Sequence, residues 1–172
     1  MKKILFIAFA ILTLASCQQQ KIGFVDNVEL INSYQKKIDT DERIKGKIDA
    51  FQKRTDSLRQ SFQLEINDAE IKARKMSQAG IQKLSKDLQD KEQVLSKRVQ
   101  FEQNLIAEES RSENDSLIKT VREFVKDYGK KNGYSFILGS NEAGSVMYGD
   151  EASDLTQIIL DALNAEYKKE TE

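Results

Sequence analysis

Residues 44–76 read IKGKIDAFQKRTDSLRQSFQLEINDAEIKARKM, and apolar or small side chains recur along them at steps of three or four residues. This is a heptad pattern with one four-residue insertion between Phe62 and Ile66. Such a stripe is too narrow for a helix lying on a globular core, so it predicts a long helix that needs a partner helix. The stripe consists of Ile44, Ile48, Phe51, Thr55, Leu58, Phe62, Ile66, Ala69, Ala73 and Met76.

A second helical run, residues 81–130, supplies that partner. We expect the chain to reverse at residues 77–80, with Gly80 in a left-handed turn conformation. The predicted fold is therefore mostly α, with an antiparallel helical hairpin about 65 Å long. Polar residues around Lys91, Glu102, Glu109 and Glu113 interrupt the second stripe, which indicates a loosely packed middle. That stripe consists of Leu84, Leu88, Leu95, Val99, Ile106, Leu117, Val121, Phe124 and Tyr128.

The two ends of the chain have short apolar runs typical of strands. Residues 21–26, 134–138 and 145–148 are predicted strands, and Asp154 is expected to cap a final helix. These elements predict a small α+β body. The expected organisation is a signal at residues 1–16, then a tether, first strand and helix start at 17–35. The hairpin follows at 36–130, and a strand pair with the C-terminal helix at 131–172.

The first residues have the pattern of an export signal. Lys2 and Lys3 precede an apolar run at residues 4–14, which is too short to span a bilayer. The sequence Leu14-Ala15-Ser16-Cys17 resembles the lipobox of bacterial lipoproteins, which implies lipidation of Cys17 and anchoring to a membrane. The alternative is an ordinary signal peptide cut near Ala15 or Ser16, in which Cys17 has no role.

The composition argues against an enzyme. The chain of 172 residues has no His, and its single Cys is Cys17. Catalytic triads and common transition-metal sites therefore lack their usual residues, and we expect no catalytic residue, metal or cofactor. Without Lys2 and Lys3 the chain has 25 basic and 28 acidic residues, a net charge of about −3. This balance gives no reason to expect nucleic-acid binding.

The order of strand, long hairpin, strand pair and helix resembles the Skp/OmpH family of periplasmic chaperones. The residues that carry the resemblance are 21–26, 134–148 and Asp154-Leu155-Thr156. The resemblance implies a homotrimer whose strands join into a barrel, with hairpins around a cavity that holds unfolded outer-membrane proteins, here called clients, without ATP. The lipobox and the acidic balance depart from the family pattern. The expected barrel residues are Ile22, Phe24, Phe136, Ile137, Leu138, Val146 and Tyr148.

Two groups of residues are candidates for client binding. Residues 72–86 contain five basic side chains and no acid, whereas residues 142–172 contain eight acidic and two basic ones. A basic hairpin end would attract acidic clients or anionic lipid headgroups, and the alternative is a solvated turn. Phe101 and Leu105 lie off the second stripe and are expected to contact clients, unless they only join the helices. The five basic residues are Lys72, Arg74, Lys75, Lys83 and Lys86.

The predicted function is that of an ATP-independent periplasmic holdase for unfolded outer-membrane proteins. The alternative is a lipid-anchored coiled-coil scaffold of the cell envelope. Anchoring in the outer membrane is preferred. In enteric bacteria an Asp after the lipidated Cys retains a lipoprotein in the inner membrane, and Gln18-Gln19-Gln20 contains no Asp. Asp56-Ser57-Leu58 and Asp115-Ser116-Leu117 match an O-glycosylation motif of Bacteroidetes, but a three-residue match arises easily by chance.

Overall fold

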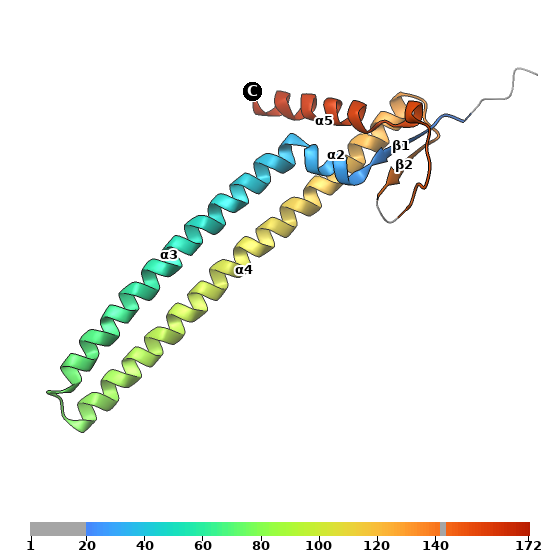
Figure 1. Ribbon diagram of the computed structural model, residues 1–172. Coiled ribbons are helices and arrows are strands. Elements are labelled where there is room, and N and C mark those ends of the chain that lie inside the picture. The colour runs from blue at the N-terminus through green and yellow to red at the C-terminus, as the bar shows by residue number, and fades with distance from the viewer. Residues whose placement is uncertain (1–19, 142–143) are drawn as a thin grey trace, which may run out of the picture. The chain divides into compact units, whose positions relative to one another are not determined.

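The computed structural model describes residues 20–141 and 144–172 (Figure 1). It confirms a mostly helical fold with a small sheet. The chain forms two compact units: Lys36–Ile118, here called the hairpin unit, and the described residues up to Gln35 together with Lys119–Glu172, here called the body unit. In chain order the elements are β1 (Ile22–Asp26), α2 (Asn27–Ser33), α3 (Gln35–Ala73), α4 (Gln78–Lys131), β2 (Phe136–Ser140), the short 3-10 helix η1 (Glu151–Ser153) and α5 (Thr156–Thr171).

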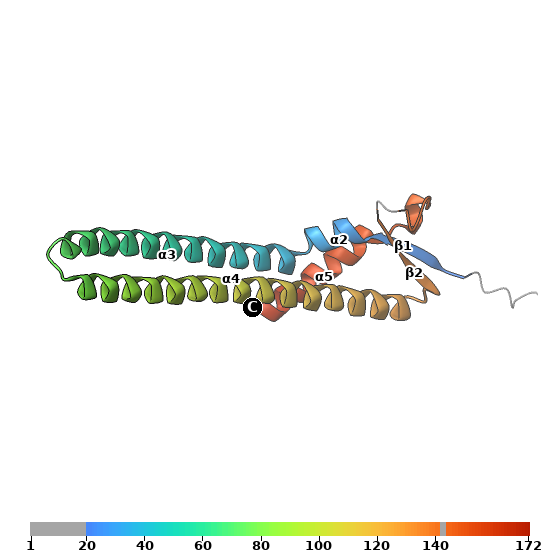
Figure 2. The same cartoon turned by 90° about the horizontal axis from the view of Figure 1, so that it is seen from below.

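In the hairpin unit, α3 and α4 run antiparallel and side by side (Figures 1 and 2). The two helices are joined on one side by ion pairs, among them Arg43 with Glu113 at 2.7 Å and Arg54 with Glu102 at 3.2 Å. Both helices are far longer than an average helix, which follows from long runs without Pro and with a regular apolar stripe.

The chain reverses at residues 74–77 and not at 77–80. Gly80, expected in a left-handed turn, lies in the first turn of α4 instead, and the described glycines with positive φ are Gly133 and Gly144. The reason is that Ser77 caps the N-terminus of α4. The hydroxyl of Ser77 accepts a hydrogen bond from the Gly80 N–H at 3.3 Å, so α4 starts directly after Ser77.

The predicted apolar stripe of α3 is only partly buried. Ile44, Thr55 and Ala69 are buried against α4, while Ile48 and Met76 are exposed. Met76 follows the end of α3 and so has left the stripe. Ile48 lacks a partner because α4 has no large apolar side chain between Ile106 and Leu117. The seam is therefore discontinuous, as the polar interruptions of the second run indicated.

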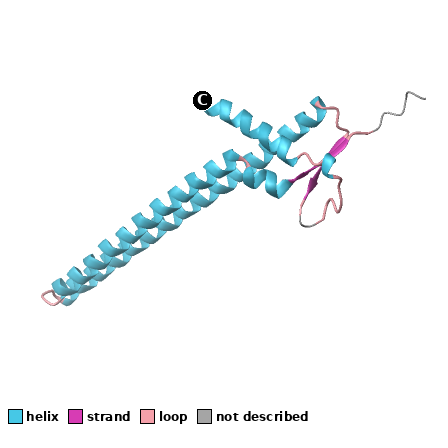
Figure 3. Ribbon diagram, turned by 45° about the horizontal axis from the view of Figure 1, so that its top comes forward, coloured by secondary structure: helices cyan, strands magenta, loops and turns pink. Residues whose placement is uncertain are grey.

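The sheet of the body unit has two parallel strands, β1 and β2 (Figure 3). Ile22 pairs with Phe136 and Phe24 with Leu138, so these four side chains share one face. The other face carries Gly23, Val25 and Ile137. Val25 is buried, and Ile137 lies against Gly129 of α4.

The predicted strand at residues 145–148 does not form. The described residues 144–150 are bends and irregular chain. Val146 is half-buried, and Met147 and Tyr148 are exposed. A strand needs a neighbour to satisfy its backbone hydrogen bonds, but residues 144–150 pair with neither outer edge of the sheet. The outer edge of β1 forms an isolated bridge between Phe24 and Asp154 instead. The closing segment therefore contributes one strand and not a pair.

The core of the body unit lies between α2 and α5. Leu30, Ile159 and Leu163 are fully buried there. The final helix begins at Thr156, two residues after the predicted cap Asp154, but that carboxylate accepts hydrogen bonds from both the N–H and the hydroxyl of Thr156. The Thr156 hydroxyl also accepts a hydrogen bond from the Asp26 N–H at 2.8 Å, which ties α5 to the end of β1.

Candidate binding surfaces

One side of the hairpin unit carries a row of ion pairs between the two helices. On α3 the row consists of Arg43, Lys47, Arg54 and Glu65, and on α4 their partners are Lys91, Glu102, Glu109 and Glu113. Hydrogen bonds from Lys47 and Arg43 hold the pKa of the Glu109 carboxyl below its usual value. Arg98 and Arg54 lower the pKa of Glu102 in the same way. These pairs link the two helices in the middle of the hairpin, where large apolar side chains are few.

Next to this ion-paired side, α4 carries a row of exposed apolar side chains. Val94 is 65% exposed, Phe101 63% and Leu105 50%. Steps of seven and four residues place the three on one face of the helix. Leu105 also lines a groove of about 410 Å³ together with Lys47 and Arg54. Phe101 and Leu105 are thus exposed and do not fill the seam.

Val94 was not among the predicted client-binding residues, although it lies seven residues before Phe101 and therefore on the same helix face. Exposed aromatic and aliphatic side chains are costly for a monomer to leave in water when they gather on one face. A helix whose partner is already in place has no structural need for such a row. The row Val94, Phe101 and Leu105 is therefore a candidate surface for apolar partners.

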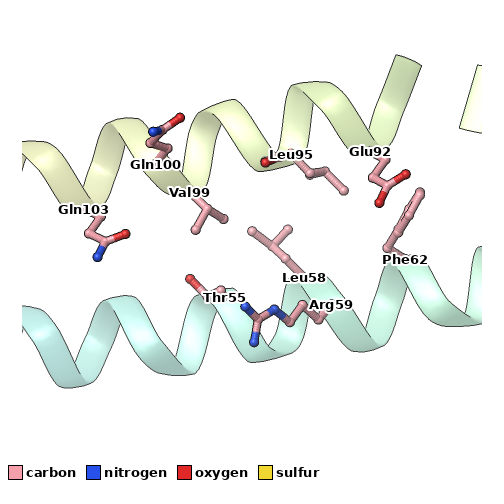
Figure 4. Close-up of a pocket in the computed structure, with 10 residues that line it drawn as sticks. Thr55, Leu58, Arg59, Phe62, Glu92, Leu95, Val99, Gln100 and Gln103 are labelled. Carbon is pink, nitrogen blue, oxygen red and sulfur yellow. The ribbon is translucent and has the colours of Figure 1, made fainter. Parts of the chain in front are cut away.

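The middle of the seam contains a groove of about 540 Å³ between α3 and α4. Figure 4 shows Leu58 and Phe62 of α3 pointing toward α4, and Leu95 and Val99 of α4 pointing toward α3. Arg59, Glu92, Gln100 and Gln103 border the groove with polar groups. The side chains of the two helices thus leave a groove between them here, as expected for a seam with few large side chains.

The five basic residues lie around the reversal of the chain. Lys72 lies in the last turn of α3, Arg74 and Lys75 lie in the connection, and Lys83 and Lys86 lie in the first turns of α4. All five are exposed. Within residues 20–141 and 144–172, none of them has an acidic group within 4.0 Å. Unpaired cations at one end of the hairpin unit create a positive potential there.

The outer face of the sheet is apolar and largely exposed. Ile22, Phe136 and Leu138 are exposed, and Phe24 is half-buried under Gly149. Ile137, predicted alongside them, is on the opposite face against α4 and belongs to the packing of the body unit. Tyr148 is exposed, and Val146 is half-buried.

The described residues show no group of His, Cys, Asp and Glu that could hold a metal ion. No described helix is long and apolar enough to cross a membrane. Cys17 and the rest of the signal segment lie outside the described residues.

Residues 21–163 match the family model of outer membrane proteins of the OmpH-like type. The chain belongs to the OmpH-like family. The matched region contains every described strand, the whole hairpin and the first half of α5, so the family pattern extends over both units. Residues 1–18 match a second model, the lipid attachment site of prokaryotic membrane lipoproteins, and this match includes Cys17.

A solved structure shares the OmpH-like fold. It is the crystal structure of a candidate outer membrane chaperone (OmpH-like) from Caulobacter crescentus CB15, with a TM-score of 0.76 and 16% sequence identity. The alignment covers 86% of this chain and 85% of that one. No curated protein matches the sequence.

Proposed function

We propose that this OmpH-like chain is an ATP-independent holdase that keeps unfolded outer-membrane proteins from aggregating in the periplasm. The observation that carries the proposal is the exposed row of Val94, Phe101 and Leu105 on a helix that is already paired. Membership of the OmpH-like family and the chaperone name of the solved relative support it. The protein acts by binding and not by catalysis.

The surface of the hairpin unit suits partners without a fixed shape. The exposed apolar side chains of α4 are interspersed with charged ones, so many weak contacts replace one shaped pocket. A fully buried large apolar side chain contributes roughly 1.5–3 kcal/mol, and a side chain on a wet surface contributes less. Several such contacts hold a client while still allowing its release.

The basic residues around the chain reversal have a separate role in the proposal. Exposed charges act over about 8 Å at physiological salt. They therefore speed the capture of acidic client segments and contribute little to the lifetime of the complex. Lys72, Arg74, Lys75, Lys83 and Lys86 would provide this steering.

We further propose that three copies assemble through the body unit. A sheet of two strands is marginal alone, and both of its outer edges lack a described strand neighbour. The apolar outer face formed by Ile22, Phe24, Phe136 and Leu138 would be covered when the strands of three copies form a barrel. Val146 and Tyr148 of the closing segment would border that contact. Three copies also multiply the weak client contacts of each hairpin.

The match to a lipid attachment site supports a tethered form of the chaperone. Lipidation of Cys17 would hold the N-terminus at a membrane, with the outer membrane preferred. β1 of the body unit begins at Ile22, five residues after Cys17, so the body unit would remain close to the lipid surface. Mass spectrometry of the membrane fraction should show an acylated N-terminal Cys17.

The proposal is tested by client-binding kinetics with two sets of variants. Phe101→Ser combined with Leu105→Ser should speed release of an unfolded outer-membrane protein, because apolar contacts are lost. Charge reversal at the five basic residues should slow capture, by a factor that shrinks at high salt. The matched control is Leu64→Ser combined with Ile71→Ser, which removes two exposed apolar residues of α3. Unchanged release from the Phe101 and Leu105 variant would contradict the proposed surface.

A further inference from the structure

The body unit contains a small recess of about 260 Å³ that the proposed function does not use. Three aromatic side chains line it: Tyr34, which follows α2, Phe124 of α4 and Tyr167 of α5. The rings of Tyr34 and Tyr167 meet edge to face, with centroids 6.0 Å apart. Ligand pockets for drug-sized molecules usually exceed about 300 Å³, so this recess suits a single chemical group or side chain.

Acidic side chains surround the aromatic recess. Glu123 and Asp127 of α4 and Glu166 and Glu170 of α5 contribute four carboxylates, against a single cation, Lys131. Glu123 and Asp127 have basic neighbours only at 4.0 and 3.8 Å. In the part of the chain that the structure describes, Glu166 and Glu170 have no basic group within 4.0 Å. The recess is therefore negatively charged.

The hydroxyl of Tyr34 is an independent sign of a missing partner. Tyr34 is only 3% exposed and lines the recess. Its hydroxyl has no hydrogen-bond partner among the described residues. Every fully enclosed side-chain oxygen in the described part does have a partner, so this hydroxyl retains some accessible surface, and Tyr34 lines the recess. Burial and then the charges of Glu170 and Glu166 raise the pKa of Tyr34 to about 12, so it stays neutral at physiological pH.

We propose that this recess binds a cationic nitrogen group, a primary ammonium or a guanidinium. Aromatic rings attract such cations through the negative charge of their faces. The unpaired carboxylates of Glu166 and Glu170 supply the counter-charge, and the neutral Tyr34 hydroxyl accepts a hydrogen bond from the N–H. A lysine or arginine side chain of another protein and a free polyamine carry the same chemistry. The site does not depend on client holding.

The ammonium group of Lys131 would compete with an external cation for the carboxylates of the recess. Lys131 lines the recess and has no ion pair within 4.0 Å in residues 20–141 and 144–172. Its flexible ammonium can approach the same carboxylates and would oppose an incoming cation. Lys131→Gln should therefore tighten binding of an external ammonium group, whereas a recess that attracts no cation would be indifferent to this change.

The test is a titration of the mature chain with n-butylammonium, followed by NMR of ring-labelled tyrosines. The signals of Tyr34 and Tyr167 should shift saturably, and that of the exposed Tyr148 should not. n-Butanol, a neutral molecule of similar size, should leave them unchanged. Glu166→Gln combined with Glu170→Gln should weaken binding about tenfold, equivalent to about 1.4 kcal/mol. Both carboxylates are exposed, so the fold should survive, which circular dichroism verifies.

The matched control is Glu151→Gln combined with Glu172→Gln, which removes two acids from the body unit outside the recess and should not change binding. A second titration replaces n-butylammonium with Nα-acetyl-lysine methylamide. Tighter binding of n-butylammonium would identify a free amine as the ligand, and tighter binding of the lysine derivative would identify a protein side chain. Absence of saturable shifts in both titrations would overturn the proposal. So would equal shifts with n-butanol, or unaltered affinity in the Glu166 and Glu170 variant.

Discussion

The same substitution, glycine to alanine, should have opposite effects on stability at Gly23 of the body unit and at Gly46 of the hairpin unit. A Cβ atom at Gly23 of β1 would lie 2.5 Å from Cδ1 of Leu155, which is buried and cannot move aside. Gly23→Ala should therefore lower the free energy of unfolding of the body unit by about 1–3 kcal/mol. A Cβ at Gly46 of α3 would meet nothing within 4 Å. Gly46→Ala should instead stabilise the hairpin unit by about 0.5–1 kcal/mol.

Urea unfolding, followed with one probe in each unit, measures both glycine variants. Unchanged stability in Gly23→Ala would contradict the close contact between β1 and Leu155. A loss of stability in Gly46→Ala would show that helix propensity does not govern position 46. The sequence alone suggested neither effect, because a lone glycine in a strand or helix does not reveal what lies beside it.

Tyr34 makes stability dependent on pH in the alkaline range. Its pKa is raised from 10.0 to about 12 by burial and by Glu170 and Glu166. Below pH 10 the Tyr34 phenol is protonated in both the folded and the unfolded state, so its contribution to the free energy of unfolding is fully present. Between about pH 10 and 12 only the unfolded state releases the proton, and the free energy of unfolding falls. Tyr34→Phe should lack this part of the decline, and parallel curves for the two proteins would contradict the assignment.

At the scale of elements, the long helices followed from the regular spacing of apolar residues, whereas their connections did not. Gly80 suggested a turn by its flexibility, but capping by Ser77 decides where α4 begins. The apolar run at 145–148 suggested a strand, yet the described residues 144–150 pair with neither outer edge of the sheet. The parallel pairing of β1 with β2 joins residues more than a hundred positions apart, which local patterns do not encode.

The groove in the middle of the hairpin yields a prediction for α3 and α4 as a pair. Thr55 is buried and lines the groove of about 540 Å³, so a larger apolar side chain has space there. Thr55→Leu should raise the free energy of unfolding of the hairpin unit by about 1 kcal/mol. Ser61→Leu places the same side chain at an exposed position of α3 and should change stability by less than about 0.5 kcal/mol. Thermal unfolding compares the two, and a loss of stability in Thr55→Leu would show that the groove is filled.

The two faces of the sheet should have different roles in the whole molecule. The outer face should serve assembly into trimers, and the face toward α4 should serve folding of the body unit. Phe136 is exposed on the outer face, so Phe136→Asp should leave a folded chain that no longer forms trimers. Ile137 lies against Gly129, so Ile137→Asp should disrupt the body unit itself. Light scattering and circular dichroism distinguish these outcomes. A wild-type chain that stays monomeric at micromolar concentration would refute the proposed assembly.

The measurement that tests the holdase most directly is an aggregation assay. Unfolded outer-membrane proteins of several unrelated kinds are diluted from urea into buffer with the mature chain and without nucleotide, and their light scattering is followed. We expect suppression for each protein at near-stoichiometric concentrations, weakened in the Phe101→Ser, Leu105→Ser variant. If the chain leaves aggregation of all of them unchanged, or binds only one folded partner, it is a scaffold of the envelope and not a holdase.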